Sequence, residues 1–182
     1  MKISYNWLKQ LIHTDKTPQE LSLILTNIGL EVESLDKVQA VVGGLEGLKI
    51  GKVLSCEQHP NADRLRVTRV TFGGTEEFQI VCGAPNVAAG QTVVVAPVGC
   101  TVYPNEGEPF KIKESKIRGE VSQGMICAED EIGLGKSHDG IMVLDNNAPL
   151  GVDASAYFKL NDDFLFEIGL TPNRSDAASH LG

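Results

Sequence analysis

Aromatic side chains and positive charges are both scarce in this sequence of 182 residues. Aromatic residues make up 5% of the chain, and 16 Lys and Arg stand against 24 Asp and Glu, a net charge of −8. An acidic chain does not bind nucleic acid or anionic membranes indiscriminately, because such binding needs a basic surface. Any contact with RNA is therefore expected to use a small part of the surface.

Cysteine pairs at metal-binding spacing and long apolar runs are also missing. The four cysteines are 26, 18 and 27 residues apart, so there is no C-x-x-C pair and a zinc site is disfavoured. No stretch approaches the 18 consecutive apolar residues of a membrane-spanning helix, and the first residues lack the apolar run of a secretory signal. We therefore expect a cytoplasmic protein with reduced cysteines and no metal ion. The cysteines are Cys56, Cys82, Cys100 and Cys127.

Apolar residues, at 42% of the chain, are abundant enough for a hydrophobic core. In the middle of the chain they occur in short runs of β type separated by turns, and 19 glycines and eight prolines fit a strand-rich body. Five or six short strands over about a hundred residues are typical of a small barrel of the OB type. The expected strands cover residues 48–56, 65–72, 77–82, 92–97, 110–117 and 141–144.

Helical patterns are confined to the two ends of the chain. Thr17, Pro18 and Glu20 form a capping-box pattern, and apolar residues then recur at helical spacing as far as Gly29. A shorter helix is expected over residues 5–12. Two further short strands are expected, over residues 30–35 and 164–168.

These patterns predict an α+β fold in which a five-stranded OB-type barrel is inserted into a small α/β module. The barrel is assigned to residues 42–151, and the split module to residues 1–41 and 152–182. Ser175 and Asp176 resemble the start of a helix that the sequence ends too soon to complete. We therefore expect the sequence to be part of a longer chain.

The most distinctive string is residues 59–65, which runs His-Pro-Asn-Ala-Asp-Arg-Leu. Proline fixes the backbone, and Asn and Asp bond to their own backbone, so the string predicts a rigid turn that leads into a strand. His59 and Asp63 also offer a base and an orienting group, but no motif with a nucleophile accompanies them. A structural corner is therefore favoured over a catalytic pair.

Positive charge gathers in two places within the predicted barrel. With a strand period of two, the lysines on either side of Ile112 share a face opposite that residue. A single cluster of this kind is usually a solvated surface, whereas two clusters on an OB barrel are suited to follow a phosphate backbone. The first cluster is Arg64, Arg66 and Arg69, and the second is Lys111, Lys113, Lys116 and Arg118.

Ser122 and Met125 follow the second cluster directly. A small hydroxyl and a flexible thioether beside a basic strand are suited to contact a nucleotide. They are equally suited to a tight turn with Met125 in the core, which is the commoner use of methionine. Cys127 has no neighbouring His motif, so it is not expected to act as a nucleophile.

Four strings, at residues 59–65, 80–87, 117–127 and 131–134, follow one another along the chain. Together they resemble the tRNA-binding OB domain that is free-standing or attached to several aminoacyl-tRNA synthetases. Three flanking strings, at 4–8, 25–33 and 171–176, resemble the N-terminal region of bacterial phenylalanyl-tRNA synthetase beta subunits. The resemblance covers the whole chain, and its one motif departure, Ile132 where the family often has Leu, is conservative.

The resemblance implies a longer parent chain in a ligase of two alpha and two beta subunits, which uses ATP and magnesium to attach phenylalanine to its tRNA. In that family the alpha subunit carries aminoacylation, and later beta-subunit domains carry editing and the main anticodon contact. We therefore expect no catalytic residue, metal ligand or cofactor site in this sequence, and we expect neither DNA nor a membrane as a partner.

The resemblance and the two basic clusters together predict a tRNA-contacting surface. The cations would hold phosphates without reading sequence, and with four aromatic residues in the barrel region, base stacking is expected to be limited. The expected tRNA-binding residues are Asn61, Arg64, Arg66, Arg69, Lys111, Lys113, Lys116, Arg118, Ser122 and Met125. An alternative is an architectural module that docks against other domains or the alpha subunit through the apolar helix stripe, and a free-standing hydrolase is the least favoured hypothesis.

Overall fold

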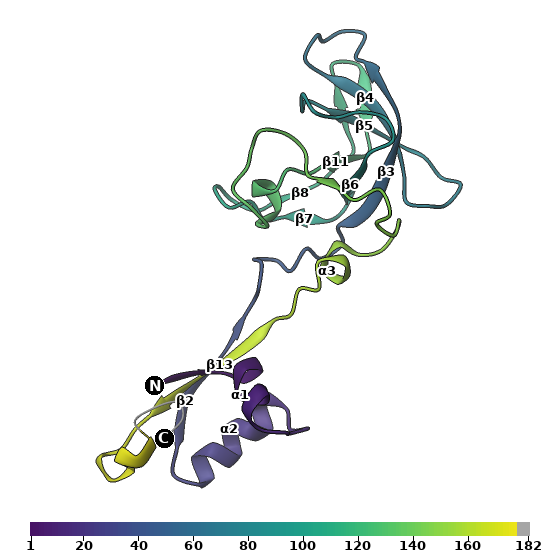
Figure 1. Ribbon diagram of the computed structural model, residues 1–182. Helices are drawn as coiled ribbons and strands as arrows, with labels where there is room; N and C mark the ends of the chain where they lie inside the picture. Colours follow the sequence, from purple (N-terminus) through teal and green to yellow (C-terminus); the bar gives the residue numbers. More distant parts are fainter. Residues whose placement is uncertain (178–182) are drawn as a thin grey trace. The chain divides into compact units, whose positions relative to one another are not determined.

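The computed structural model describes residues 1–177, and the chain forms two compact units (Figure 1). The larger unit is Val41–Leu160, and the smaller one joins Met1–Ala40 to the residues from Asn161 onward. The helix that the sequence analysis expects after Ser175 extends into residues 178–182, which lie outside the described residues. Within residues 1–177, no helix has the length and apolar character needed to span a membrane.

The larger unit is a nearly closed antiparallel barrel of five strands. Neighbouring strands follow the order β11–β6–β3–β4–β5, and the seam between β5 and β11 is bridged by the Gln123 N–H, which donates to the Gln79 carbonyl at 2.8 Å. The predicted OB-type barrel within an α+β chain is confirmed. Its strands are β3 (Lys49–Gln58), β4 (Arg66–Thr71), β5 (Phe78–Cys82), β6 (Thr92–Pro97) and β11 (Gly124–Ile126).

Strand β6 pairs with β3 and β11 and is buried on both faces. Val93 and Val95 pack into one core cluster, whereas Val94 and Ala96 pack into the other, and all four are fully buried. A strand covered on both faces has an uninterrupted apolar sequence, as residues 93–97 of β6 do. Each buried valine contributes about 1.5–3 kcal/mol to the free energy of unfolding.

The larger unit continues beyond the boundary at residue 151 that the sequence suggests. Helix α3 (Ala154–Tyr157) begins at a fully buried alanine, whose N–H donates to the Leu48 carbonyl at 2.8 Å. Phe158 and Leu160 pack against the same core cluster as Leu48. Residues 153–160 therefore cover one part of the barrel core and end the larger unit at Leu160.

Residues 98–122 form two small hairpins. The prediction of a single strand over residues 110–117 is therefore wrong. Ile112 exchanges backbone hydrogen bonds with Gly99 and Cys100 at 2.9 Å, whereas the residues from Ser115 onward pair with the strand that follows. The chain changes its hydrogen-bonding partner between Ile112 and Ser115, and this change interrupts the strand. The hairpins join β7 (Thr101–Val102) to β8 (Phe110–Lys111) and β9 (Ser115–Ile117) to β10 (Glu120–Ser122). Beyond β11 follow a 3-10 turn (Asp130–Ile132) and β12 (Val143–Leu144), which pairs with β6.

The smaller unit is a three-stranded sheet with two helices. The strands lie in the order β1–β13–β2, and Leu21 packs with Phe166 and Ile168 as the buried core. Arg174, in a 3-10 turn (Pro172–Ala177), donates to the Ile28 carbonyl at 2.9 Å and so closes the end of α2. The elements are β1 (Lys2–Ser4), α1 (Tyr5–Leu11), α2 (Pro18–Asn27), β2 (Glu31–Val38) and β13 (Asp163–Gly169).

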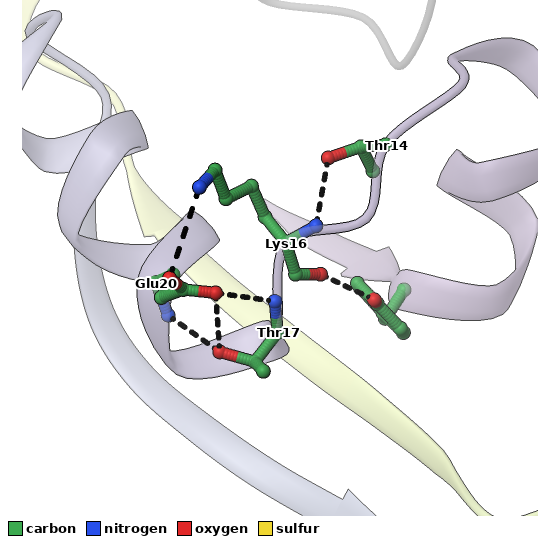
Figure 2. A network of polar contacts seen from close by, with 5 residues as sticks. Thr14, Lys16, Thr17 and Glu20 are labelled. Atoms are coloured by element: carbon green, nitrogen blue, oxygen red, sulfur yellow. Dashed lines mark hydrogen bonds and ion pairs between the residues drawn. The ribbon is translucent and has the colours of Figure 1, made fainter.

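The predicted capping box at the start of α2 is confirmed (Figure 2). The Glu20 N–H donates to the Thr17 hydroxyl at 3.2 Å, and the Thr17 N–H donates back to the Glu20 carboxylate at 2.9 Å. The Thr17 hydroxyl also donates to the Glu20 carboxylate, at 3.1 Å. The two hydrogen bonds that this carboxylate accepts from Thr17, with the Lys16 ammonium 3.8 Å away, hold the pKa of Glu20 below its ordinary value. Two N–H groups that the helix itself leaves without partners are thereby satisfied.

Candidate nucleic-acid interface

A polar groove runs along the outer face of strands β3, β4 and β5. Along β4, Thr68 and Val70 are buried, so the alternation of a strand turns Val67 and Arg69 outward into this groove. Strands β4 and β5 are the second and third of the barrel, the face on which OB folds bind oligonucleotides. The groove has a volume of about 390 Å³ and is lined by Ser55, Glu57, Gln58, Pro60, Val67, Arg69, Gln79 and Glu120.

Arg69 lies at the centre of the groove, opposite Ser55 on β3 and Gln79 on β5. The Gln79 amide donates to the Glu120 carboxylate at 2.9 Å, which fixes one wall. Arg69 forms no ion pair with any residue of the described chain, so its guanidinium is available to an anion. The groove also holds the Glu57 and Glu120 carboxylates, so it is polar and is not uniformly positive.

The turn at residues 59–65 is tied to the β9–β10 hairpin through His59. The His59 ring is 2% exposed; its Nδ1 accepts the Asn61 N–H at 3.0 Å, and its Nε2 lies 3.0 Å from the Ile117 carbonyl. Because an N–H only donates and a carbonyl only accepts, these partners assign a neutral ring with its proton on Nε2. The predicted structural corner is confirmed, and His59 is bonded to backbone atoms on both sides.

Two further hydrogen bonds hold the turn in place. The Asn61 side-chain amide donates to the Arg118 carbonyl at 3.1 Å, and the Gln58 amide donates to the Asp63 carbonyl at 2.9 Å. Arg118 and Gly119 both have positive φ, at 49° and 108°, and they form the two-residue loop that joins β9 to β10. This loop presents the Arg118 side chain to solvent beside Asn61.

Five exposed cations lie on β4, on the turn before it, and on and just before the β9–β10 hairpin, and we call them the rim cations. Arg66 lies opposite Gln58, which lines the groove, and Lys113 precedes Glu114, which accepts a hydrogen bond from the Gln123 amide at 3.4 Å. Over residues 1–177 none of the five forms an ion pair. The rim cations are Arg64, Arg66, Lys113, Lys116 and Arg118.

Three of the residues expected to bind tRNA lie elsewhere. Lys111 is exposed but pairs with Thr101 on the β7–β8 hairpin, outside the groove lining. Ser122 is 3% exposed, and its hydroxyl accepts the Val81 N–H at 3.1 Å and donates to the Gly124 carbonyl at 3.0 Å. It therefore joins β5 to the β10–β11 segment and does not line the groove. Met125 packs against the core and borders a different pocket.

The groove also contains residues that the sequence analysis does not single out. Glu57, Gln79 and Glu120 come from three separate strands, and no local pattern marks them. Period-two alternation along β4 is the one available signal, since it places Arg69 on the face opposite Thr68.

Cys127 is fully buried, which raises the pKa of its thiol well above the ordinary value, so the thiol stays protonated.

The family of the chain follows from residues 48–153, which match the family model described as "Putative tRNA binding domain". The chain belongs to this family. Its tRNA-binding domain, as matched, contains all eight residues that line the groove and all five rim cations. The groove and the rim are therefore part of the family's domain.

Curated relatives extend the likeness to the whole chain. Phenylalanine--tRNA ligase beta subunits from Bacteroides fragilis and Porphyromonas gingivalis are 56% and 53% identical over all 182 residues. The chain spans 22% of the length of each relative. The resemblance to phenylalanyl-tRNA synthetase beta subunits, predicted from the seven strings, is confirmed.

A solved structure, of a MetRS related protein from Pyrococcus horikoshii, is 24% identical, with a TM-score of 0.40 over 57% of this chain and 84% of that one. In the described part of the chain, no three His, Cys, Asp or Glu side chains are grouped so that they could hold a metal ion.

Proposed function

We propose that the chain contacts tRNA through the groove and the rim cations. The observation that supports this is Arg69, a guanidinium without an ion pair in the described chain, on the barrel face where OB folds take oligonucleotides. The rim cations lie on the same strand, on the turn before it, and on and just before the hairpin that contributes Glu120 to the groove. Lysine and arginine side chains position a phosphate backbone without reading its sequence. Glu57 and Glu120 in the same groove repel phosphate, so the backbone is expected to follow the rim while polar groups face the groove.

The parent protein, in this proposal, is an ATP- and magnesium-dependent phenylalanine–tRNA ligase that charges tRNA(Phe). The chain serves as the tRNA-positioning part of its beta subunit, beside an alpha subunit that carries the chemistry. The support is the name of relatives that match the full chain at up to 56% identity. We place the ATP and magnesium sites in the rest of that ligase.

Binding of tRNA to the chain should weaken steeply as salt is added. Each phosphate contact contributes about −0.7 to −0.9 to the slope of log affinity against log salt, because the bound cation displaces condensed counterions. About four contacts give a slope near −3, which corresponds to a loss of about 60-fold between 50 and 200 mM salt. Filter binding of tRNA over this range measures the slope. Retention that is equal at both salt concentrations would contradict the proposal.

A second candidate function, docking to the alpha subunit, is favoured by apolar residues on the helices of the smaller unit. Leu23 and Ile28 are 68% and 60% exposed on and just beyond α2, and Leu11 and Ile12 are exposed at the end of α1. A helix normally turns such residues toward a core. The relatives are named as beta subunits, so the occupant we propose for this surface is the alpha subunit.

Replacing Leu23 and Ile28 by serine in the full-length beta subunit should abolish co-purification of the alpha subunit. The reason is that two exposed apolar anchors are lost while the buried Leu21, which holds α2 to the sheet, is kept. Val143→Ser, at a valine of the barrel unit that is 45% exposed, is the control and should leave the complex intact. An intact complex with the double variant would contradict the docking proposal and leave the tRNA proposal unaffected.

A further inference from the structure

A second pocket lies between the end of β5, strand β11 and the segment at residues 128–141, and it is separate from the groove. It has a volume of about 360 Å³. Two of the strings singled out in the sequence, residues 80–87 and 117–127, meet in its lining. Its walls include the apolar side chains Val81, Pro85, Met125 and Ile141. These walls suit a flat, apolar-faced ligand, since proline and methionine pack well against rings.

Glu131 supplies the one carboxylate of the pocket lining. Its Oε2 accepts the Ala128 N–H at 2.7 Å, which fixes the side chain, and no hydrogen bond from the described residues reaches its Oε1. Glu131 also has no cationic partner within residues 1–177. His138, the other ionisable side chain of the lining apart from the buried Cys82 thiol, is bonded at 2.8 Å to Asp130. The pocket therefore presents a fixed acceptor between apolar walls.

The chemistry of that acceptor selects among the four RNA bases. An ionised carboxylate only accepts hydrogen bonds, so it is suited to a ligand edge that carries adjacent N–H donors. Guanine has two such donors, at N1 and N2, on its Watson–Crick edge. Adenine and cytosine place a ring acceptor next to their amine, and uracil flanks its one N–H with two carbonyls, so each of these brings a lone pair against the carboxylate.

We propose that this pocket binds an unpaired guanine, whose N1–H and N2–H donate to Glu131 while its ring lies between Met125 and Pro85. The proposal rests on the proposed function, because it takes the ligand of the domain to be RNA. It adds a base-specific site to a surface whose cations hold phosphates without regard to sequence. The favoured RNA therefore presents an unpaired guanine beside the backbone that follows the rim.

The test compares three single-stranded pentanucleotides: UUGUU, the same sequence with inosine in place of guanosine, and UUUUU. Inosine lacks the N2 amine and otherwise matches guanosine. Fluorescence anisotropy with the 182-residue chain should give at least about tenfold tighter binding of UUGUU than of the other two, as expected for a lost hydrogen bond to a charged group. The Met125 methyl signal should shift on addition of UUGUU, with Met1 and Met142 as internal references.

Glu131→Gln should remove the guanine preference and leave the affinity for UUUUU unchanged. Glutamine keeps a carbonyl for the Ala128 N–H, so the fold is maintained, but it brings an amine toward the base. Asp139→Asn removes a nearby charge outside the pocket lining and should leave the preference intact. Equal affinity for the guanosine and inosine oligonucleotides overturns the proposal, as does a Glu131→Gln variant that still prefers guanosine.

Two further outcomes separate this inference from the proposed function. If tRNA binding depends on salt and on the rim cations while inosine binds as well as guanosine, the guanine site alone is wrong. If arginine amide, a mimic of a protein ligand, shifts the Met125 methyl at lower concentration than UUGUU, the pocket serves a protein partner and the base assignment is overturned. A preference for guanosine without salt-dependent tRNA binding supports the guanine site in the pocket and contradicts the proposal that tRNA binds at the groove.

Discussion

Replacing Arg69 and Arg118 together by glutamine should lower the affinity for tRNA on the order of 100-fold at 0.1 M salt. Each arginine is exposed and without an ion pair, so each can make a charge-assisted contact worth about 1.5 kcal/mol, and about 3 kcal/mol corresponds to that factor. Arg69 lies in the groove, and Arg118 lies in the loop of the β9–β10 hairpin. The magnitude of the slope of log affinity against log salt should also fall by about 1.4 to 1.8, because two phosphate contacts are lost. Filter binding over a salt series measures both quantities.

The matched control for this double variant removes two lysines of the same unit that lie outside the groove and the rim. Lys136 and Lys159 are both exposed, and Lys159 has a φ of 52°, close to the 49° of Arg118, so backbone strain is comparable in the two double variants. Lys136→Gln with Lys159→Gln should change the affinity less than about threefold, an effect of general charge alone. Equal losses of affinity in the two double variants would show that net charge governs binding. They would contradict the proposal that tRNA binds at the groove.

Elements with a strong local pattern could be predicted from the sequence. The capping box at Thr17 predicts the start of α2, and the apolar run at residues 92–97 predicts β6, because each depends on neighbours in the chain. The β9–β10 hairpin could not be predicted as easily. Its two-residue loop, Arg118-Gly119, places a non-glycine residue at positive φ, and the residues before it read as one continuous strand.

The site was harder to predict than the fold, because it depends on the register between strands. Arg69 faces Ser55 and Gln79 only after β3 and β5 have paired with β4, and a bulge in β3 between Val53 and Ser55 sets which residues meet. The orientation of Ser122 also depends on strand register. Its neighbours suggest a nucleotide contact, but the register of β10 turns it inward, where its hydroxyl serves the Val81 N–H.

Replacing His59 by alanine should lower the free energy of unfolding of the barrel unit by about 3 kcal/mol. The substitution leaves the Asn61 N–H and the Ile117 carbonyl without partners, each at a cost of about 1–3 kcal/mol where water cannot reach, and it removes a buried ring. Urea denaturation of the chain measures the change. The loss should be accompanied by weaker tRNA binding, because the turn and the β9–β10 hairpin, which carry rim cations, are no longer held together.

Two other variants separate the parts of this effect. His59→Asn keeps an acceptor near the position of Nδ1, so it should restore the bond to the Asn61 N–H but not the one to Ile117, and its stability should lie between the wild type and His59→Ala. His138→Ala is the control, since this ring is 76% exposed and its pair with Asp130 contributes at most about 1 kcal/mol. If His59→Ala is as stable as His138→Ala, His59 does not hold the two rim elements together. The position of Arg118 beside Asn61 would then depend on the Asn61 amide and the Arg118-Gly119 loop alone.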